Sequence, residues 1–213
     1  MGRLRRFSHA RPRPGFTILM LLLPTLSGCL SPLGPPLLLA RWLVQPGLQR
    51  GACPRLASLD GSQTPEQLYR GVAGCMRHSD LDTAVVLYSL AAAYGRYDAM
   101  RVADPSAHQA GTLLRLLALQ QLNDAQRQAL SQGVATALSD PGRQPDLCAT
   151  IERIGPPSYR PDAMLRHGVV ALRQSLPDAR SSAAVASSGL VQGFDGQAAW
   201  NQVLDRVLRC GKA

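Results

Sequence analysis

The sequence predicts an all-α protein whose single domain contains about six or seven helices. After residue 63, apolar residues recur at intervals of three and four along most of the chain, as on one face of an α-helix. Residues that cap helices precede several of these stretches. No window shows the sustained alternation of apolar and polar residues that is typical of a half-buried strand.

Two helices joined by a short turn are expected directly after residue 63. Thr64 can cap the first, Pro65 lies where its missing N–H is harmless, and Gln67 can bond back to the cap. Residues 79–82 start the second helix, and apolar positions within 81–92 form a wide stripe. The short connection predicts an antiparallel helical hairpin.

The third and fourth helices have equally clear start signals. Asp104 and Pro105 open a helix that runs to about Leu122 and is apolar on most of its circumference, so we expect it to be the central helix. Asn123 and Gln126 have capping-box spacing and begin the fourth helix, which Asp-Pro-Gly stops after residue 139.

Three further helices are expected near the C-terminus, over residues 146–154, 161–174 and 196–208. The last is expected to end at Cys210 and Gly211, because glycine readily adopts the left-handed conformation that caps a helix. These helices complete a domain of ordinary size.

An export signal is predicted over residues 1–28. Five arginines precede an apolar run from Phe16 to Pro24, and small residues follow before Cys29. This run of about nine residues is well short of the roughly 20 that a transmembrane helix needs. A basic head, a short apolar core and small residues at the cleavage site are typical of a signal peptide.

The residues Leu26-Ser27-Gly28-Cys29 resemble the lipobox of bacterial lipoproteins. The resemblance implies that the Cys29 thiol is diacylated, that the chain is cut before it, and that the new amino group is acylated. In such proteins an aspartate after the cysteine marks retention in the inner membrane, so Leu30 implies the periplasmic face of the outer membrane. The alternative is an ordinary secretory signal, which favours an Ala-x-Ala-like site.

Behind the signal, residues 29–62 are expected to form a lipidated tether and residues 63–213 the helical periplasmic domain. Proline and glycine are frequent in the tether and resist regular structure. The apolar stretch 37–44 within it suits either the membrane interface or an arm docked on the domain.

Nucleic acid is not an expected partner. The chain has 23 Lys and Arg against 14 Asp and Glu, but five arginines lie in the export signal, which leaves 18 against 14. Those basic residues are scattered singly, whereas a nucleic-acid interface gathers them on one face. The expected partners are the membrane, through the lipid on Cys29, and an unidentified envelope protein.

Four cysteines remain when Cys29 is assigned to lipid, namely Cys53, Cys75, Cys148 and Cys210. An even number in an oxidising compartment predicts two disulfides, and the absence of Cys-x-x-Cys argues against a redox motif or zinc knuckle. Three pairings are open. Our working hypothesis joins Cys53 to Cys75 and Cys148 to Cys210, and four free buried thiols are the alternative.

The sequence contains no recognisable catalytic motif, so no catalytic residue, metal or cofactor is expected. It lacks His-Glu-x-x-His, Gly-x-Ser-x-Gly, a glycine-rich phosphate loop and a dinucleotide fingerprint. Asp104 and His108 are one helical turn apart and could form an acid–base pair, but Asp104 is more simply a helix cap. A deep cleft holding this pair, or His167 with a nearby acid, would favour an enzyme.

Two constrained surface segments are the candidates for protein recognition. One is the corner after the second helix, with Arg96, Tyr97 and Arg101, and the other is the proline-rich loop with Tyr159 and Arg160. Arginine and tyrosine are frequent anchors of interfaces. The alternative is that the tyrosines pack at the edge of the core.

Ala84, Tyr88 and Ala91 resemble the second helix of a tetratricopeptide repeat, but only one helix of one unit is covered. The sequence therefore favours a lipid-anchored periplasmic protein that acts by protein–protein interaction or scaffolding. An inhibitor or immunity lipoprotein is the alternative, and a cell-wall hydrolase is the third possibility.

Overall fold

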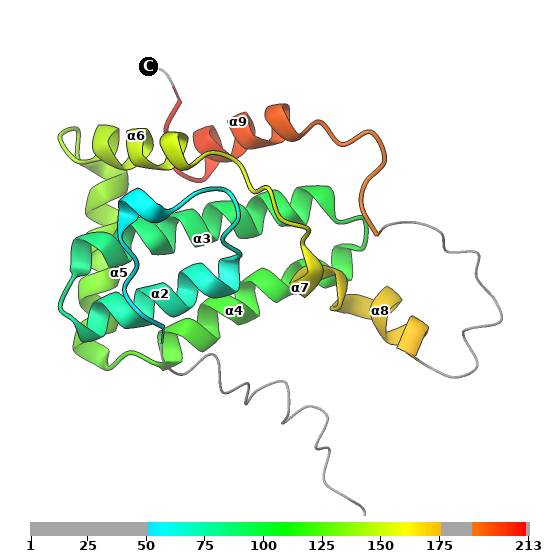
Figure 1. The fold of residues 1–213 in the computed structure, drawn as a ribbon, viewed down its shortest axis with the longest axis horizontal. Coiled ribbons are helices and arrows are strands. Elements are labelled where there is room, and N and C mark those ends of the chain that lie inside the picture. The colour runs from blue at the N-terminus through cyan, green and yellow to red at the C-terminus, as the bar shows by residue number, and fades with distance from the viewer. Residues whose placement is uncertain (1–50, 176–188, 212–213) are drawn as a thin grey trace, which may run out of the picture.

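The computed structural model describes residues 51–175 and 189–211. The export signal, Cys29 and the tether up to residue 50 lie outside this part of the chain. The described residues form eight α-helices and two short 3-10 helices, and they contain no strand, only an isolated bridge between Val102 and Leu190. The prediction of an all-α fold is confirmed (Figure 1).

The helices follow one another along the chain with short connections. In order they are η2 (Leu56–Ser58), α2 (Pro65–Arg77), α3 (Leu81–Arg101), η3 (Pro105–His108), α4 (Gln109–Gln120), α5 (Asp124–Ser139), α6 (Gln144–Ile154), α7 (Asp162–Leu165), α8 (Gly168–Ser175) and α9 (Gly196–Arg206).

Side-chain caps set the starts of three of these helices where the sequence predicts them. Thr64 and Asn123 each form a complete capping box with the glutamine three residues later, at the starts of α2 and α5. The carboxylate of Asp80 accepts a hydrogen bond from the Thr83 N–H at the start of α3. These contacts satisfy backbone donors that a helix leaves free at its N-terminus.

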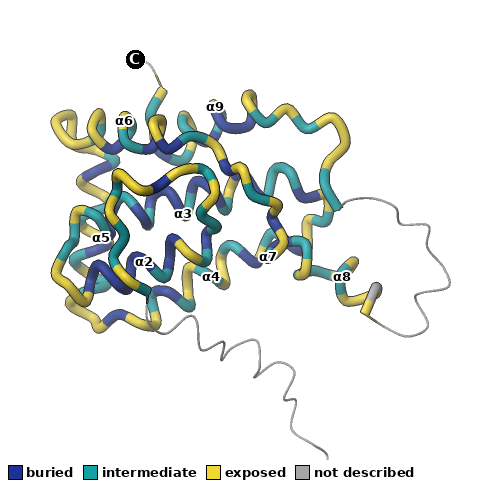
Figure 2. Tube along the Cα trace, viewed as in Figure 1, coloured by how far each residue is buried: buried dark blue, intermediate teal, exposed yellow. Residues whose placement is uncertain are grey.

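The central helix is α3, against which α2, α4, α5, α6 and α9 all pack. Its alanines let neighbouring helices approach closely, and Ala84, Leu87 and Leu90 have no exposed surface. The expectation that the leucine-rich helix 105–122 is central is wrong, because α4 lies at an edge and leaves Leu113 and Leu116 exposed. In Figure 2, α3 accordingly contains far more buried residues than α4.

The helix expected over residues 161–174 is divided into α7 and α8. Gly168 has a φ of +91°, which ends one helix and starts the next at a new angle. A Cβ atom at this position would lie 2.6 Å from Oδ2 of Asp104. The same carboxylate accepts a hydrogen bond from the Val170 N–H, and Ser106 Oγ accepts one from the Val169 N–H. Contacts with η3, distant in sequence, therefore fix the start of α8.

The end of α9 also differs from the prediction, since the helix stops at Arg206 and Gly211 does not cap it. Arg209 is the residue with left-handed backbone, at a φ of 56°. The backbone N–H of Cys210 then donates to the Leu204 carbonyl over 2.8 Å. The disulfide at Cys210 holds this turn against α6, so the neighbouring residue adopts the conformation that glycine was expected to provide.

Both disulfides have the pairing of the working hypothesis. Cys53 is bonded to Cys75, 22 residues later, and Cys148 to Cys210, 62 residues later. The first joins the segment before η2 to α2, and the second joins α6 to the turn after α9 (Figure 1). Residues 51–62, expected to belong to the tether, pack against the domain here, and Leu59 is buried.

Candidate functional site

A groove with a volume of about 770 Å³ lies between the N-terminal half of α2, helix α4 and residues 159–167. Leucines of α4 and Met164 form an apolar wall. Gly95 and the buried Asp98 of α3 also line the groove. Both signs of charge occur among the remaining lining residues, which include Glu66, Arg70, Arg160, Asp162 and Arg166.

The groove borders a polar cluster, which we call the Asp98 cluster and which consists of the buried Tyr97 and Asp98 and the half-buried Arg101 and Tyr159. Only 3% of Asp98 is exposed. Its Oδ1 accepts from Arg101 Nε at 3.0 Å and lies 2.8 Å from Arg101 Nη2, while its Oδ2 accepts from the Tyr159 hydroxyl at 3.0 Å. The Arg101 guanidinium lies 5.2 Å from the ring centre of Tyr97 and 5.1 Å from that of Tyr159.

Burial dominates the electrostatics of this cluster. It raises the pKa of the Asp98 carboxyl above its ordinary value, and the nearby Arg101 guanidinium opposes that rise. Burial, followed by the negative charge of Asp98, raises the pKa of the Tyr159 phenol. Tyr159 therefore keeps its proton and serves as a hydrogen-bond donor to Asp98.

Aromatic packing joins the Asp98 cluster to α9 and to the loop before α7. The Tyr94 ring centre lies 6.0 Å from that of Tyr159 and 5.8 Å from that of Trp200, and the Tyr94 hydroxyl donates to the Gly155 carbonyl at 2.8 Å. Tyr97 meets Phe194 edge to face, with ring centres 5.4 Å apart. The loop is thereby held in place beside the groove.

The structure brings together three of the five sequence-predicted recognition residues, because Tyr97, Arg101 and Tyr159 meet in the Asp98 cluster. They contact one another at the edge of the core, as the alternative of packing at the core edge describes. Arg160 lies on the groove, with Nη1 3.2 Å from Asp162 Oδ1. Arg96 is exposed on α3 and does not line the groove.

Sequence reasoning missed Gly95 and the α4 wall as parts of a site. Glycine inside a helix costs about 1 kcal/mol of stability relative to alanine, so a glycine there often has a structural reason. Gly95 and Gly111 could therefore have indicated a close helix contact or an open space. A Cβ atom on Gly111 would lie 4.0 Å from the Gly95 Cα, whereas one on Gly95 would have no neighbour within 4 Å. Position 95 therefore opens into the groove.

The histidines considered for catalysis have structural contacts. Asp104 accepts hydrogen bonds from Ser106 and from the N-terminus of α8, and Nε2 of His108 lies 3.0 Å from the Val102 carbonyl oxygen. His167 lines the groove, and its Nδ1 contacts the carbonyl oxygen of Ala163 one turn earlier.

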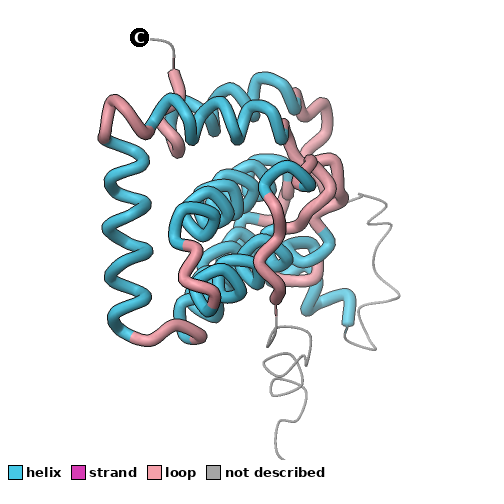
Figure 3. The backbone as a smooth tube through the Cα atoms, turned by 60° about the vertical axis from the view of Figure 1, so that its left-hand side comes forward, coloured by secondary structure: helices cyan, strands magenta, loops and turns pink. Residues whose placement is uncertain are grey.

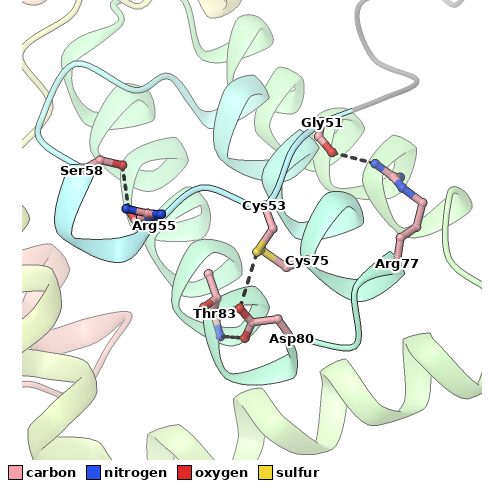
Figure 4. The surroundings of a disulfide bond; sticks show 8 residues. All are labelled: Gly51, Cys53, Arg55, Ser58, Cys75, Arg77, Asp80 and Thr83. Carbon is pink, nitrogen blue, oxygen red and sulfur yellow. Dashed lines mark hydrogen bonds between the residues drawn. A yellow bond between two sulfur atoms is a disulfide. The ribbon is translucent and has the colours of Figure 1, made fainter.

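Cys53, Cys75 and Asp80 are the one group of three metal-ligating residues that the described part of the chain gathers in one place. Oδ2 of Asp80 lies 3.6 Å from Sγ of Cys53 (Figure 4). The two sulfurs are bonded to each other, so neither is available as a thiolate, the form that binds metal. Asp80 also caps α3, which accounts for its position.

No protein-family model, curated protein or solved structure matches the chain. An open groove with an apolar wall, charges of both signs and a rigid aromatic neighbour is suited to binding a ligand of mixed polarity.

Proposed function

We propose that the protein is a lipid-anchored protein on the periplasmic face of the outer membrane, and that its helical domain binds a segment of a partner protein in the groove. The groove itself is the observation that carries this proposal. The lipobox ending at Cys29 supports the location, since the chain between Cys29 and the domain could hold the groove close to the membrane.

A protein segment suits the groove because the lining offers both kinds of contact that a peptide requires. Leu113, Leu114 and Leu117 can receive apolar side chains, while Arg160 and Asp162 lie where polar and charged groups would bind. Apolar contacts supply most of the affinity of such interfaces, and the polar rim supplies specificity. If the partner is a foreign enzyme, the same contact makes the protein an inhibitor or immunity lipoprotein.

A hydrolase is a second candidate because His167 lines the groove together with two acids, Glu66 and Asp162. The contact between the His167 ring and the Ala163 carbonyl is within the helical turn and gives the imidazole a local structural partner. A binding role for the groove is therefore favoured over a role of His167 as a general base.

Lipidation is tested by Cys29→Ser. Cells grown with radioactive palmitate should label the wild-type protein and a Ser31→Ala control, but not the Cys29→Ser variant, because the variant lacks the thiol that receives the acyl groups. Gel fluorography of the immunoprecipitated protein measures the label. Equal labelling of all three would contradict the lipid anchor and leave the groove proposal to the next experiment.

Gly95→Leu should block the groove without unfolding the domain. The new side chain would project into open space, and Gly95→Ala, which adds one methyl group to a helix interior, should stabilise the domain by about 1 kcal/mol. A photoreactive phenylalanine analogue at Ala163, in the intact envelope, should capture a partner in wild type and Gly95→Ala. We expect at least a tenfold loss of that crosslink in Gly95→Leu.

The control for this crosslink places the same analogue at Asn201, which is exposed on α9 away from the groove. It should capture the partner in none of the three backgrounds. An unchanged crosslink from Ala163 in Gly95→Leu, with a wild-type thermal midpoint, would show that the groove is not where the partner binds.

A further inference from the structure

Exposed apolar side chains are concentrated on two helices, α4 and α8. Among the described residues, six large apolar side chains are exposed, and five of them lie on α4 or α8. Leu116 is 50% exposed and Leu172 62%. We call this surface the α4–α8 face, and its five apolar residues are Leu113, Leu116, Val169, Val170 and Leu172.

The two helices are held on one side of the domain by shared contacts. Both contact η3, and both contact α7. Asp104 and Ser106 at η3 bond the first backbone N–H groups of α8, as described above, which positions that helix. In Figures 1 and 3, α4 and α8 occupy the lower side of the molecule, and α6 and α9 occupy the upper side.

The charges on these helices are all of one sign. Arg115 is the charged residue of α4 and Arg173 that of α8, and neither Gln109–Gln120 nor Gly168–Ser175 contains an acid. Arg166, which is exposed, lies at the connection between α7 and α8. Apolar side chains flanked by arginines are typical of helices that lie in a membrane interface. The acid beside α8, Asp104, is engaged by Ser106 and by the Val170 N–H.

We propose that the α4–α8 face binds the surface of an anionic lipid bilayer. The apolar side chains would enter the headgroup region, and the arginines would pair with lipid phosphates. Among the described residues, no helix combines the length and the apolar character that a membrane crossing requires.

The entry point of the chain supports this occupant. The described chain begins at the lower side of the domain, below α2, while α8 lies at the right-hand side (Figure 1). The 21 residues 30–50 separate Cys29 from that point and can extend by at most about 70 Å, so a lipid on Cys29 leaves the face within reach of the bilayer. This step rests on the proposed anchor. Leu113 belongs both to the groove and to the α4–α8 face, so one edge of the groove would lie at the membrane.

The experiment uses the lipidated protein, purified and added to preformed vesicles. An environment-sensitive fluorophore is attached to a cysteine introduced as Leu172→Cys or Leu116→Cys, and to matched exposed positions Asn201→Cys on α9 and Glu152→Cys on α6. The four native cysteines of the domain are paired and do not react. Vesicles contain phosphatidylcholine alone or with an equal amount of phosphatidylglycerol.

We expect a blue shift of at least 10 nm at positions 172 and 116 with phosphatidylglycerol, and less than half of it with phosphatidylcholine or after Arg115→Gln and Arg173→Gln together. Positions 201 and 152 should not shift. Flotation reports anchoring separately, so a loss of the anchor is distinguished from a loss of face contact. Two results with vesicles would overturn the proposal: no shift at positions 172 and 116 in protein that floats, or an equal shift at all four positions. A shift that depends on protein concentration without vesicles would also overturn it, and would indicate that the face binds a second copy of the chain.

Discussion

Asp98→Ala should lower the free energy of unfolding by about 3 to 5 kcal/mol. The substitution leaves the Arg101 guanidinium, whose side chain is only 12% exposed, without its carboxylate, and it removes the acceptor of the Tyr159 hydroxyl. An uncompensated charge in the interior costs far more than the net value of the pair. Urea unfolding followed by tryptophan fluorescence measures the loss, because Trp200 lies beside Tyr94 and Tyr97.

A second variant separates the pair from simple loss of packing. Asp98→Ala combined with Arg101→Leu removes both charges and should recover much of the lost stability, because well-packed apolar residues often replace a buried ion pair without cost. If Asp98→Ala alone costs less than about 1 kcal/mol, water reaches the pair and the Asp98 cluster is not a rigid neighbour of the groove.

The pH dependence of the same site follows from the raised pKa of Asp98. As the pH falls from neutrality, the folded state takes up this proton before the unfolded state, whose carboxyl titrates near the ordinary value of 3.8. As the pH falls from the folded pKa to 3.8, the free energy of unfolding of the wild type should therefore rise relative to that of Asp98→Asn. Below pH 3.8 the difference between the two proteins should stay constant. A constant difference over this interval would contradict the rise in pKa.

Replacing Cys148 and Cys210 together with alanine should lower the free energy of unfolding by about 4 kcal/mol. The bond closes a loop of 62 residues, and the entropy that a crosslink removes from the unfolded chain grows with loop length. The matched change at Cys53 and Cys75, which are separated by 22 residues, should cost about 3 kcal/mol. Denaturant midpoints of the oxidised proteins measure both losses.

Alkylation under denaturing conditions provides the control for the disulfides. Without reductant, the domain of the wild-type protein should show no reactive thiol, and each double variant should still hold its remaining disulfide. A larger loss for the shorter loop would show that native contacts around Cys53 and Cys75, and not loop closure, determine the contribution of that bond.

Much of the fold could be predicted because its signals are local in sequence. Thr64 and Asn123 each indicate a helix start together with the glutamine three positions later, and both capping boxes form as expected. The break at Gly168 was not predictable in this way, since it depends on Asp104 and Ser106, more than 60 residues earlier. The position of α4 was misjudged because leucine content does not show which helix the others surround.

The candidate site shows the same division between local and distant contacts. The residue types of Tyr97, Arg101 and Tyr159 predict a recognition site. Sequence alone does not show that Asp98 pairs with Arg101 and accepts a hydrogen bond from Tyr159, which is 61 residues away. These contacts turn the side chains inward. The groove beside them is formed by three separate segments, so its volume has no signature in any one of them.

The Cys53–Cys75 bond has a mechanical consequence. In the proposed arrangement, tension between the lipid anchor and a partner in the groove would enter the domain just after Gly51, whose carbonyl accepts a hydrogen bond from Arg77 (Figure 4). From Cys53 the pull passes through the sulfurs directly to Cys75, at the end of α2. Residues 54–74 lie between the two bonded cysteines, so a pull on the N-terminal side cannot draw out this segment, about 70 Å of chain, while the bond is intact. The part of α2 that lines the groove is therefore not stretched by a pull on the segment that would connect the domain to the membrane.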